Sequence, residues 1–338
     1  MAIKLDLVDR KILTELDRNC RISDSQLAKK VNKSRETVRY RILKLQEKGI
    51  IIGFITSINP NKLGFYMFKV YLKLENIPEE REKLFKELKE NKEIYWMGIS
   101  DGAFDLVFAI LSKSITSYYE NINFLLSKWN HLIVSRVLGT MVDTRQYSKR
   151  FFIENSHPIT PGDNFVTFGG NIVNNKIDDL DSNILDILAN EARISLLELA
   201  RKTNSTIDII RNRIKKLEDK EIILSYRISV DLNKLGMEFY KAIIYFKRLS
   251  KIDEEKLFQW MQRQPNSQYY IRSIAHWEAE LEFVVENYQK FNQIINDLRE
   301  EFHNVVRNQE HLIMIYETWM PAYKEMLRPD NKSELLGN

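Results

Sequence analysis

The stretch "LDLVDRKILTELDRNCRISDSQLAKKVNKSRETVRYRILKLQEKGII", residues 5–51, contains three amphipathic segments separated by short polar turns. Ser23 and Gln26 predict a capping box that begins the second helix. Ser34 is the expected N-cap of the third helix, whose apolar stripe at helical spacing consists of Val38, Ile42 and Leu45. The short connection between the last two helices indicates a helix-turn-helix. The following "KGIIIGFITSIN" predicts a turn into a β-hairpin wing or a connecting strand.

The same pattern occurs again in "IDDLDSNILDILANEARISLLELARKTNSTIDIIRNRIKKLEDKEII", residues 177–223. A constant shift of 172 residues aligns Asp9 with Asp181 and Arg39 with Arg211, without a gap. Ser195 and Glu198 predict a second capping box. Two long copies indicate duplication of a whole two-domain unit, because a solenoid would repeat a much shorter unit.

The remainder of each copy changes from helical to alternating periodicity. In copy one, "YMFKVYLKL" reads as a strand and a helix begins near Pro78. Two strands joined by a "DG" turn, another helix and a last strand follow, which gives the order β-α-β-β-α-β. The predicted fold class is α+β, with two winged helix-turn-helix heads and two ferredoxin-like βαββαβ sandwich domains in one chain. The expected segments are a head at 1–56, a sandwich at 57–150, a linker at 151–176, a head at 177–229, a sandwich at 230–326 and a tail at 327–338.

Charge separates the two copies. The 338-residue chain has a formal net charge of only +4, but in residues 1–55 Lys and Arg outnumber Asp and Glu by 13 to 7. In residues 177–227 the corresponding counts are 9 and 10. A local basic excess favours a polyanionic partner, although a solvated charged surface is the alternative. One cysteine allows no intramolecular disulfide, and no apolar run approaches the ~20 residues that span a bilayer, so we expect a cytoplasmic protein without a membrane partner.

Four motifs carry a resemblance to a known family. They are "LDxxDxxIL", "RISxxxLA", "SxxTVRYRIxxLxxKGII" and, at 102–105, "GAFD". Together they resemble the Lrp/AsnC ("feast/famine") transcription regulators, which join a winged helix-turn-helix to a ligand-sensing sandwich. The resemblance implies double-stranded DNA as a partner and a homo-oligomer assembled through the ferredoxin-like domains. A tandem fusion departs from the single unit of that family, so the two sheets could pair within one chain or between chains.

In that family the third helix enters the major groove, where arginine can read guanine edges. The base-edge candidates are Arg35, Glu36, Arg39 and Tyr40. The candidates for phosphate contact are Lys33 and Lys44, and Ser34 belongs to the same predicted DNA-binding set. Arg41 lies nearer the apolar stripe and is expected to be structural. Copy two offers Arg211, Asn212 and Arg213, but Ile207 and Asp208 replace Arg35 and Glu36, so we expect weaker or more selective DNA contact there. The alternative for all of these residues is a solvated helix face.

The resemblance also implies an effector, often an amino acid, near the turn between the second and third sandwich strands. The candidate effector residues are Ser100, Asp101, Gly102, Asp105, Ser135 and Arg136. An ordinary hairpin turn is the alternative. In copy two Trp277 and Glu280 stand at the places of Gly102 and Asp105, and the tryptophan could fill the pocket or stack on a ligand.

No catalytic, metal or cofactor site is predicted, because no phosphate-binding glycine loop, zinc-ligand spacing or nucleophilic triad stands out. One alternative is an enzyme that resembles the siroheme decarboxylases, which are built on the same scaffold. The five histidines, at 131, 157, 276, 303 and 311, have no shared placement in the two copies. A further alternative is a sensor or adaptor that does not bind DNA.

Overall fold

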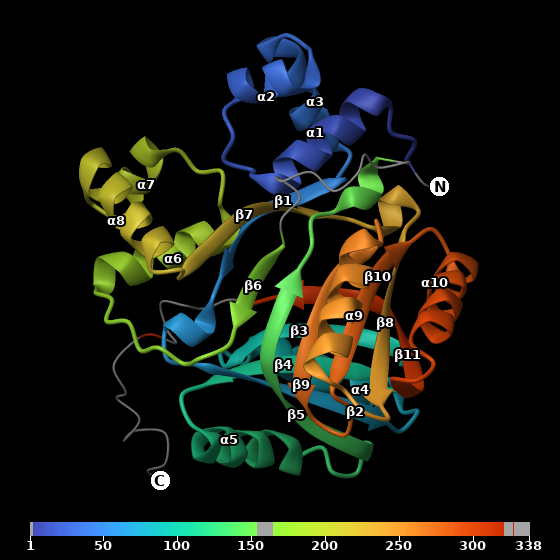
Figure 1. The fold of residues 1–338 in the computed structure, drawn as a ribbon. Coiled ribbons are helices and arrows are strands. Elements are labelled where there is room, and N and C mark those ends of the chain that lie inside the picture. Colours follow the sequence, from blue (N-terminus) through green and yellow to red (C-terminus); the bar gives the residue numbers. More distant parts are fainter. Residues whose placement is uncertain (1–2, 154–164, 321–326, 328–338) are drawn as a thin grey trace.

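The computed structural model describes residues 3–153, 165–320 and 327. It confirms an α+β chain with two helical heads next to a large closed sheet (Figure 1). Head one comprises α1 (Leu7–Arg18), α2 (Asp24–Val31), α3 (Arg35–Glu47) and β1 (Ile51–Ile58). Head two comprises α6 (Asp179–Asn190), α7 (Leu196–Lys202), α8 (Ile207–Asp219) and β7 (Ile223–Val230). Among the described residues no helix is long and apolar enough to cross a membrane.

Side-chain caps set the starts of the head helices. Ser34 Oγ accepts a hydrogen bond from the Thr37 amide at 3.1 Å, which confirms the expected start of α3. The capping box at Ser23 is present, with both reciprocal bonds. At Ser195 the side chain accepts from the Glu198 amide at 3.1 Å, so the cap is formed, but the return bond of a box is not among the described hydrogen bonds. Each satisfied amide would otherwise be left unpaired at the helix end.

The strands that follow the heads pair with each other. β1 and β7 form an antiparallel two-stranded ribbon in which Phe54 lies opposite Ile228. The sequence allowed either a β-hairpin wing or a connecting strand after each head. In the structure each head instead contributes one strand to a ribbon between the two heads. In Figure 1 this ribbon runs between head one and head two, on the side of the sheet where both heads lie.

The two predicted βαββαβ units are both present. Copy one consists of β2 (Tyr66–Leu74), α4 (Pro78–Glu90), β3 (Ile94–Gly102), β4 (Leu106–Ser112), α5 (Ile115–Ser127) and β5 (Ile133–Gln146). Copy two consists of β8 (Glu238–Phe246), α9 (Lys251–Arg263), β9 (Ser267–Ile274), β10 (Ala279–Val285), α10 (Tyr288–Glu301) and β11 (Val306–Trp319). Short 3₁₀ helices lie at Pro60–Lys62, Arg150–Phe152 and Asn233–Leu235.

The two units close into one barrel within the chain. The strand order is β2-β4-β3-β11-β8-β10-β9-β5, and β5 pairs back onto β2. The long strands β5 and β11 make this possible, because each pairs with its own unit at one end and with the other unit at the opposite end. The sheet edges that could have joined two chains are therefore already paired within one.

Part of the predicted linker is structured. In the segment 151–176, β6 (Val166–Gly169) adds to the barrel by pairing with the end of β5. Gly169 has φ +95°, and a Cβ there would lie 2.7 Å from the Cα of Asp143, so only glycine fits this approach. Phe165 and Phe168 pack against the hydrophobic cores. Residues 154–164 and most of the expected tail lie outside the described residues.

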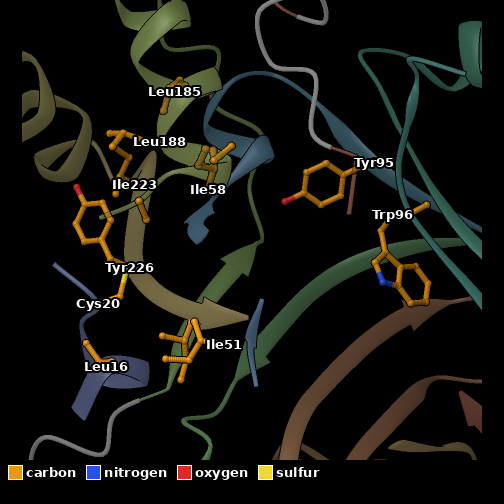
Figure 2. Packing of buried hydrophobic residues seen from close by; sticks show 14 of the residues in the cluster. Leu16, Cys20, Ile51, Ile58, Tyr95, Trp96, Leu185, Leu188, Ile223 and Tyr226 are labelled. Atoms are coloured by element: carbon orange, nitrogen blue, oxygen red, sulfur yellow. The ribbon is translucent and has the colours of Figure 1, made fainter. Parts of the chain in front are cut away.

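Three apolar clusters hold the molecule together. Two of them each lie between the strands and the helices of one βαββαβ unit. The third is shared by both heads and the barrel interior. Figure 2 shows part of this shared cluster, with Leu16 of head one, Leu188 of head two, Tyr226 of the ribbon and Trp96 of the barrel. The heads are thus packed on the barrel and not merely tethered to it.

Candidate DNA interface

The outward face of α3 is the most exposed cationic surface among the predicted sites. Val38, Ile42 and Leu45 are buried, which confirms the predicted apolar stripe. On the opposite side the exposed residues are Lys33, Ser34, Arg35, Glu36, Arg39, Tyr40 and Lys44. Arg35 and Arg39 form no ion pair with any described residue, whereas Lys44 lies 2.8 Å from Glu47 and 5.7 Å from the centre of the Tyr40 ring. Two guanidinium groups on one rigid face are therefore available to an outside partner.

Arg41 has a different role. Its guanidinium lies 2.6 Å from Asp6 and 2.8 Å from Asp9, and it ties α3 to the start of α1. Burial alone would raise the pKa of Asp6, but hydrogen bonds from the Asp9 amide and from Arg41 hold that pKa below its usual value. The expectation that Arg41 is structural agrees with this geometry.

Head two repeats this internal contact, and both of its predicted arginines have acidic partners. Arg213, a predicted DNA contact, is half-buried and lies 2.6 Å from Asp178 and 3.2 Å from Asp181, as Arg41 does in head one. Arg211 is exposed but lies 2.5 Å from Asp208. Asn212 is exposed. Arg213 is therefore committed to holding its own head together, and Arg211 must leave an intramolecular partner to reach DNA.

The structure brings several predicted effector residues together, but their polar groups already form hydrogen bonds within the protein. Asp105 is buried and accepts from the Leu74 amide at 2.8 Å and from Lys73 Nζ at 3.3 Å. Lys73 Nζ also donates to the Gly102 carbonyl at 3.0 Å, and Ser135 lies opposite Lys73 in the sheet. Lys73 is not among the residues predicted from the sequence. Its position one residue before the end of β2 gave no signal that its ammonium would face Asp105.

The other members of the predicted effector set point elsewhere. Ser100 is buried and donates to the Phe104 carbonyl at 2.9 Å, and Asp101 is exposed and accepts from the Gly102 amide at 2.8 Å. Arg136 follows Ser135 directly, so its side chain lies on the opposite face of the strand, where it interacts electrostatically with Tyr118. Gly102 has φ +118° and packs against β11, where an added Cβ would lie 2.4 Å from the His311 carbonyl oxygen.

Copy two fills the equivalent place. Trp277 is 1% exposed and packs edge-on against Tyr71 at 4.7 Å between ring centres. Glu280 is fully buried between two lysines, with Nζ–O distances of 2.9 Å to Lys69 and 2.5 Å to Lys241. Burial opposes the ionised form of Glu280, but Lys241 and Lys69 hold its pKa well below the usual range. The sequence suggested only that a carboxylate had been kept here, not that it lies in a buried charge cluster.

The described residues hold no cluster of three or more His, Cys, Asp or Glu side chains that could bind a metal. Three of the described histidines are exposed and lie on separate elements. These are His131 before β5, His276 in the turn before β10 and His303 after α10.

Comparison with known proteins agrees with the geometry of the heads. The winged helix-turn-helix DNA-binding family matches residues 5–52, and the AsnC-type helix-turn-helix domain matches residues 177–218. HTH-type transcriptional regulator Ptr1 of Methanocaldococcus jannaschii is 40% identical over 116 residues, which cover 33% of this chain and 76% of that protein. HTH-type transcriptional regulator LrpB of Bacillus subtilis is 31% identical over 123 residues, or 36% of this chain and 81% of LrpB.

The heads thus define a winged helix-turn-helix protein of the DNA-binding class. The chain belongs to the Lrp/AsnC family of helix-turn-helix transcriptional regulators, as a tandem duplication of the family unit. The siroheme decarboxylase NirDL has a similar structure over 95% of this chain and 98% of its own, with a TM-score of 0.61 and 10% sequence identity. At that identity the likeness is one of fold, and it extends over both copies.

Proposed function

We propose that this chain is a sequence-specific DNA-binding transcription regulator in which head one reads the operator. The carrying observation is the pair Arg35 and Arg39, both exposed on α3 and both without an ion-pair partner among the described residues. An exposed guanidinium presents a planar set of donors that matches guanine O6 and N7 in the major groove. Because α3 is capped at Ser34 and packed on its other side, the helix backbone that carries these side chains is held in place before DNA arrives.

Each predicted DNA-contact residue in and just before α3 has a proposed role. Arg35, Arg39 and Tyr40 contact base edges, and Glu36 accepts from a cytosine amino group. Lys33, Ser34 and Lys44 contact phosphates, which fix the register of the helix but carry no sequence information. Such a protein acts where DNA is, so we propose the cytoplasm as its location.

Head two makes a smaller contribution. Arg211 and Asn212 are the accessible polar groups, while Arg213 supports the fold. Because the ribbon joins both heads in one chain, two half-sites can be contacted by a single molecule, as a dimeric helix-turn-helix protein contacts a palindrome. The unequal heads favour an operator with one strongly specified half.

The test is selection of bound sequences from random duplex DNA with the full chain, followed by affinity measurements on the selected site. Arg35→Gln with Arg39→Gln should reduce specific affinity at least tenfold, because a good bidentate base contact contributes about 1–3 kcal/mol. The matched control removes two exposed charges from head two, by Arg211→Gln with Lys215→Gln. Equal losses in both variants would contradict the assignment to head one, and failure to select any sequence would favour a sensor or adaptor that does not bind DNA.

A second proposal is an amino-acid effector at the Gly102 turn. Asp105 is already neutralised by Lys73, with Arg81 at 3.7 Å, so a ligand ammonium would have to displace a lysine. Repeating the selection with an amino-acid mixture tests this, since a bound effector should change the recovered sequences or their affinity. Reconstitution with a tetrapyrrole tests the enzyme alternative, because specific binding would give a saturable change in the absorbance of the pigment.

A further inference from the structure

The two heads are attached to the barrel differently. In head one, Asp17 of α1 is fully buried and lies 2.9 Å from Lys149 Nζ and 3.4 Å from Arg227 of the ribbon. The shift of 172 residues aligns Asp17 with Ala189 in α6 and Arg227 with Ile55 in β1. The place that holds a buried ion cluster under head one is therefore lined by apolar side chains under head two.

A cleft occupies this place. It has three lobes of about 50, 40 and 50 Å³, and all three are bordered by Tyr269 and Trp319 of the barrel. The first lobe reaches Ala189 and Ile55, so it lies between head two, the ribbon and the barrel. An engineered apolar cavity of about 150 Å³ binds benzene, so three adjoining lobes of this size suit a small organic molecule.

Two acceptors face the inner lobes. Glu317 borders the second and third lobes and accepts from Trp96 Nε1 at 3.2 Å, but it forms no ion pair with any described residue. Gln268 borders the third lobe, is 7% exposed, and its Oε1 has no hydrogen-bond donor. A buried acceptor without a donor is costly, so Gln268 Oε1 calls for an N–H group from a ligand or from water. Glu317 is exposed and already accepts from Trp96, but its negative charge has no cationic partner among the described residues.

The charges around Glu317 do not supply a cation. Glu282 of β10 is a second carboxylate, and Lys241 of β8 is 2.5 Å from Glu280 and 2.7 Å from Glu282. Lys149 is already paired with Asp17. Burial, reinforced by the charge of Glu282, raises the pKa of Glu317 to about 7. The Glu317 carboxylate therefore lies beside a like charge, and the residue remains exposed to solvent.

The walls are aromatic. Trp319 is 37% exposed and packs edge-on against Tyr95 at 5.4 Å, and Tyr269 completes this side of the cleft. Aromatic faces suit both an apolar body and a cationic group. We propose that this cleft binds a small organic amine, with its apolar body between Trp319 and Ala189 and its ammonium donating to Glu317 and Gln268. The site is separate from the Gly102 turn and does not depend on DNA binding.

The test uses the full chain without DNA and titrates phenethylamine by calorimetry. Phenethylamine should bind saturably, and 3-phenylpropionate, which has a similar shape and the opposite charge, should not. Glu317→Gln should weaken amine binding roughly tenfold or more, because a hydrogen bond to a charged group is lost. Ala189→Leu should weaken it by filling the first lobe. Glu310→Gln, on the same strand but outside the cleft lining, should leave binding unchanged.

The pH dependence provides a second readout. Only ionised Glu317 pairs with an ammonium, so affinity should fall as the pH decreases from 8 to 6, and Glu317→Gln should abolish this dependence. The near-isosteric Glu317→Gln keeps the test decisive if Ala189→Leu unfolds. No saturable binding of the amine, or equal binding by the wild type, Glu317→Gln and Ala189→Leu, would overturn the proposal and leave the assignment of DNA binding to head one untouched.

Discussion

Replacing Asp17 with alanine should destabilise the protein far more than an ordinary loss of an ion pair. The Asp17 carboxylate accepts from the Lys149 amide at 2.7 Å, pairs with Lys149 Nζ at 2.9 Å and faces Arg227 at 3.4 Å. All three residues are at least nine-tenths buried, so truncation leaves the Lys149 amide without an acceptor and two buried cations without a carboxylate. Lys149 Nζ and Arg227 keep only neutral carbonyl acceptors, those of Ile228 and Tyr147. Breaking a buried pair by removing one partner costs about 3–5 kcal/mol, and we expect a loss of that size.

Urea unfolding followed by circular dichroism measures the effect, with Glu191→Ala as the control. Glu191 pairs with Lys202 at 2.7 Å, but its side chain is 53% exposed, so about 0–1 kcal/mol is expected there. Asp17→Ala with Lys149→Met removes a stranded cation and should recover part of the loss, which a double-mutant cycle would report as coupling. A free-energy loss below about 1 kcal/mol for Asp17→Ala would refute the reasoning, because it would place the carboxylate in the range of solvent-screened pairs.

The same residue sets a pH dependence. Burial would raise the pKa of Asp17, but Lys149 and Arg227 hold it below its usual value of 3.8. A carboxylate with a lowered pKa in the folded state contributes its stabilisation above the unfolded value and loses it as the pH falls through the folded one. The gap in stability between wild type and Asp17→Ala should therefore be constant near neutral pH and narrow below about pH 4.

Three further outcomes follow from geometry already described. If Arg35 and Arg39 contact phosphates as well as bases, their joint replacement by glutamine will make the dependence of log affinity on log salt concentration less steep. The slope should change by roughly 0.9 for each lost phosphate contact. An unchanged slope in a salt titration would restrict both arginines to base contacts. Gly102→Ala should cost about 1–3 kcal/mol, since φ is +118° and β11 lies in the way, whereas Gly170→Ala, with φ +80° and open space, should cost less in the same urea assay. Trp277→Ala should cost about 3–5 kcal/mol by emptying a fully packed site, and a loss near zero would mean that the barrel interior collapses freely.

Local sequence signals predicted the heads well. The positions of Ser23 and Ser34 fixed the starts of α2 and α3, because capping depends on residues within one turn. The βαββαβ order followed from the change between helical and alternating spacing of apolar residues along the chain. The sequence repeat implied that both copies have this same order of elements. Ser195 shows the limit of such signals, since the spacing to Glu198 predicted a full capping box and the described bonds contain half of one.

Contacts between the copies were not predictable in the same way. The sequence left open whether the sheets pair within the chain, because the residues of an edge strand do not show whether its partner strand belongs to the same chain or to another. Asp105 suggested a ligand site. Only the folded chain shows that the Lys73 ammonium already pairs with the Asp105 carboxylate. Arg213 was predicted to contact DNA although Arg41 was expected to be structural; the two sit at aligned positions and both hold the start of their own head.

The barrel formed within one chain changes how the regulator can evolve. In a symmetric homodimer every substitution appears twice, so a charge gained on one recognition helix is gained on both. Here the β1–β7 ribbon and the long strands β5 and β11 hold the two halves together in one chain. Each half has its own codons, so a substitution in one half leaves the other unchanged. One half has Asp17 and Arg35 where the other has Ala189 and Ile207, and neither difference needs a second gene or an equilibrium between subunits to persist.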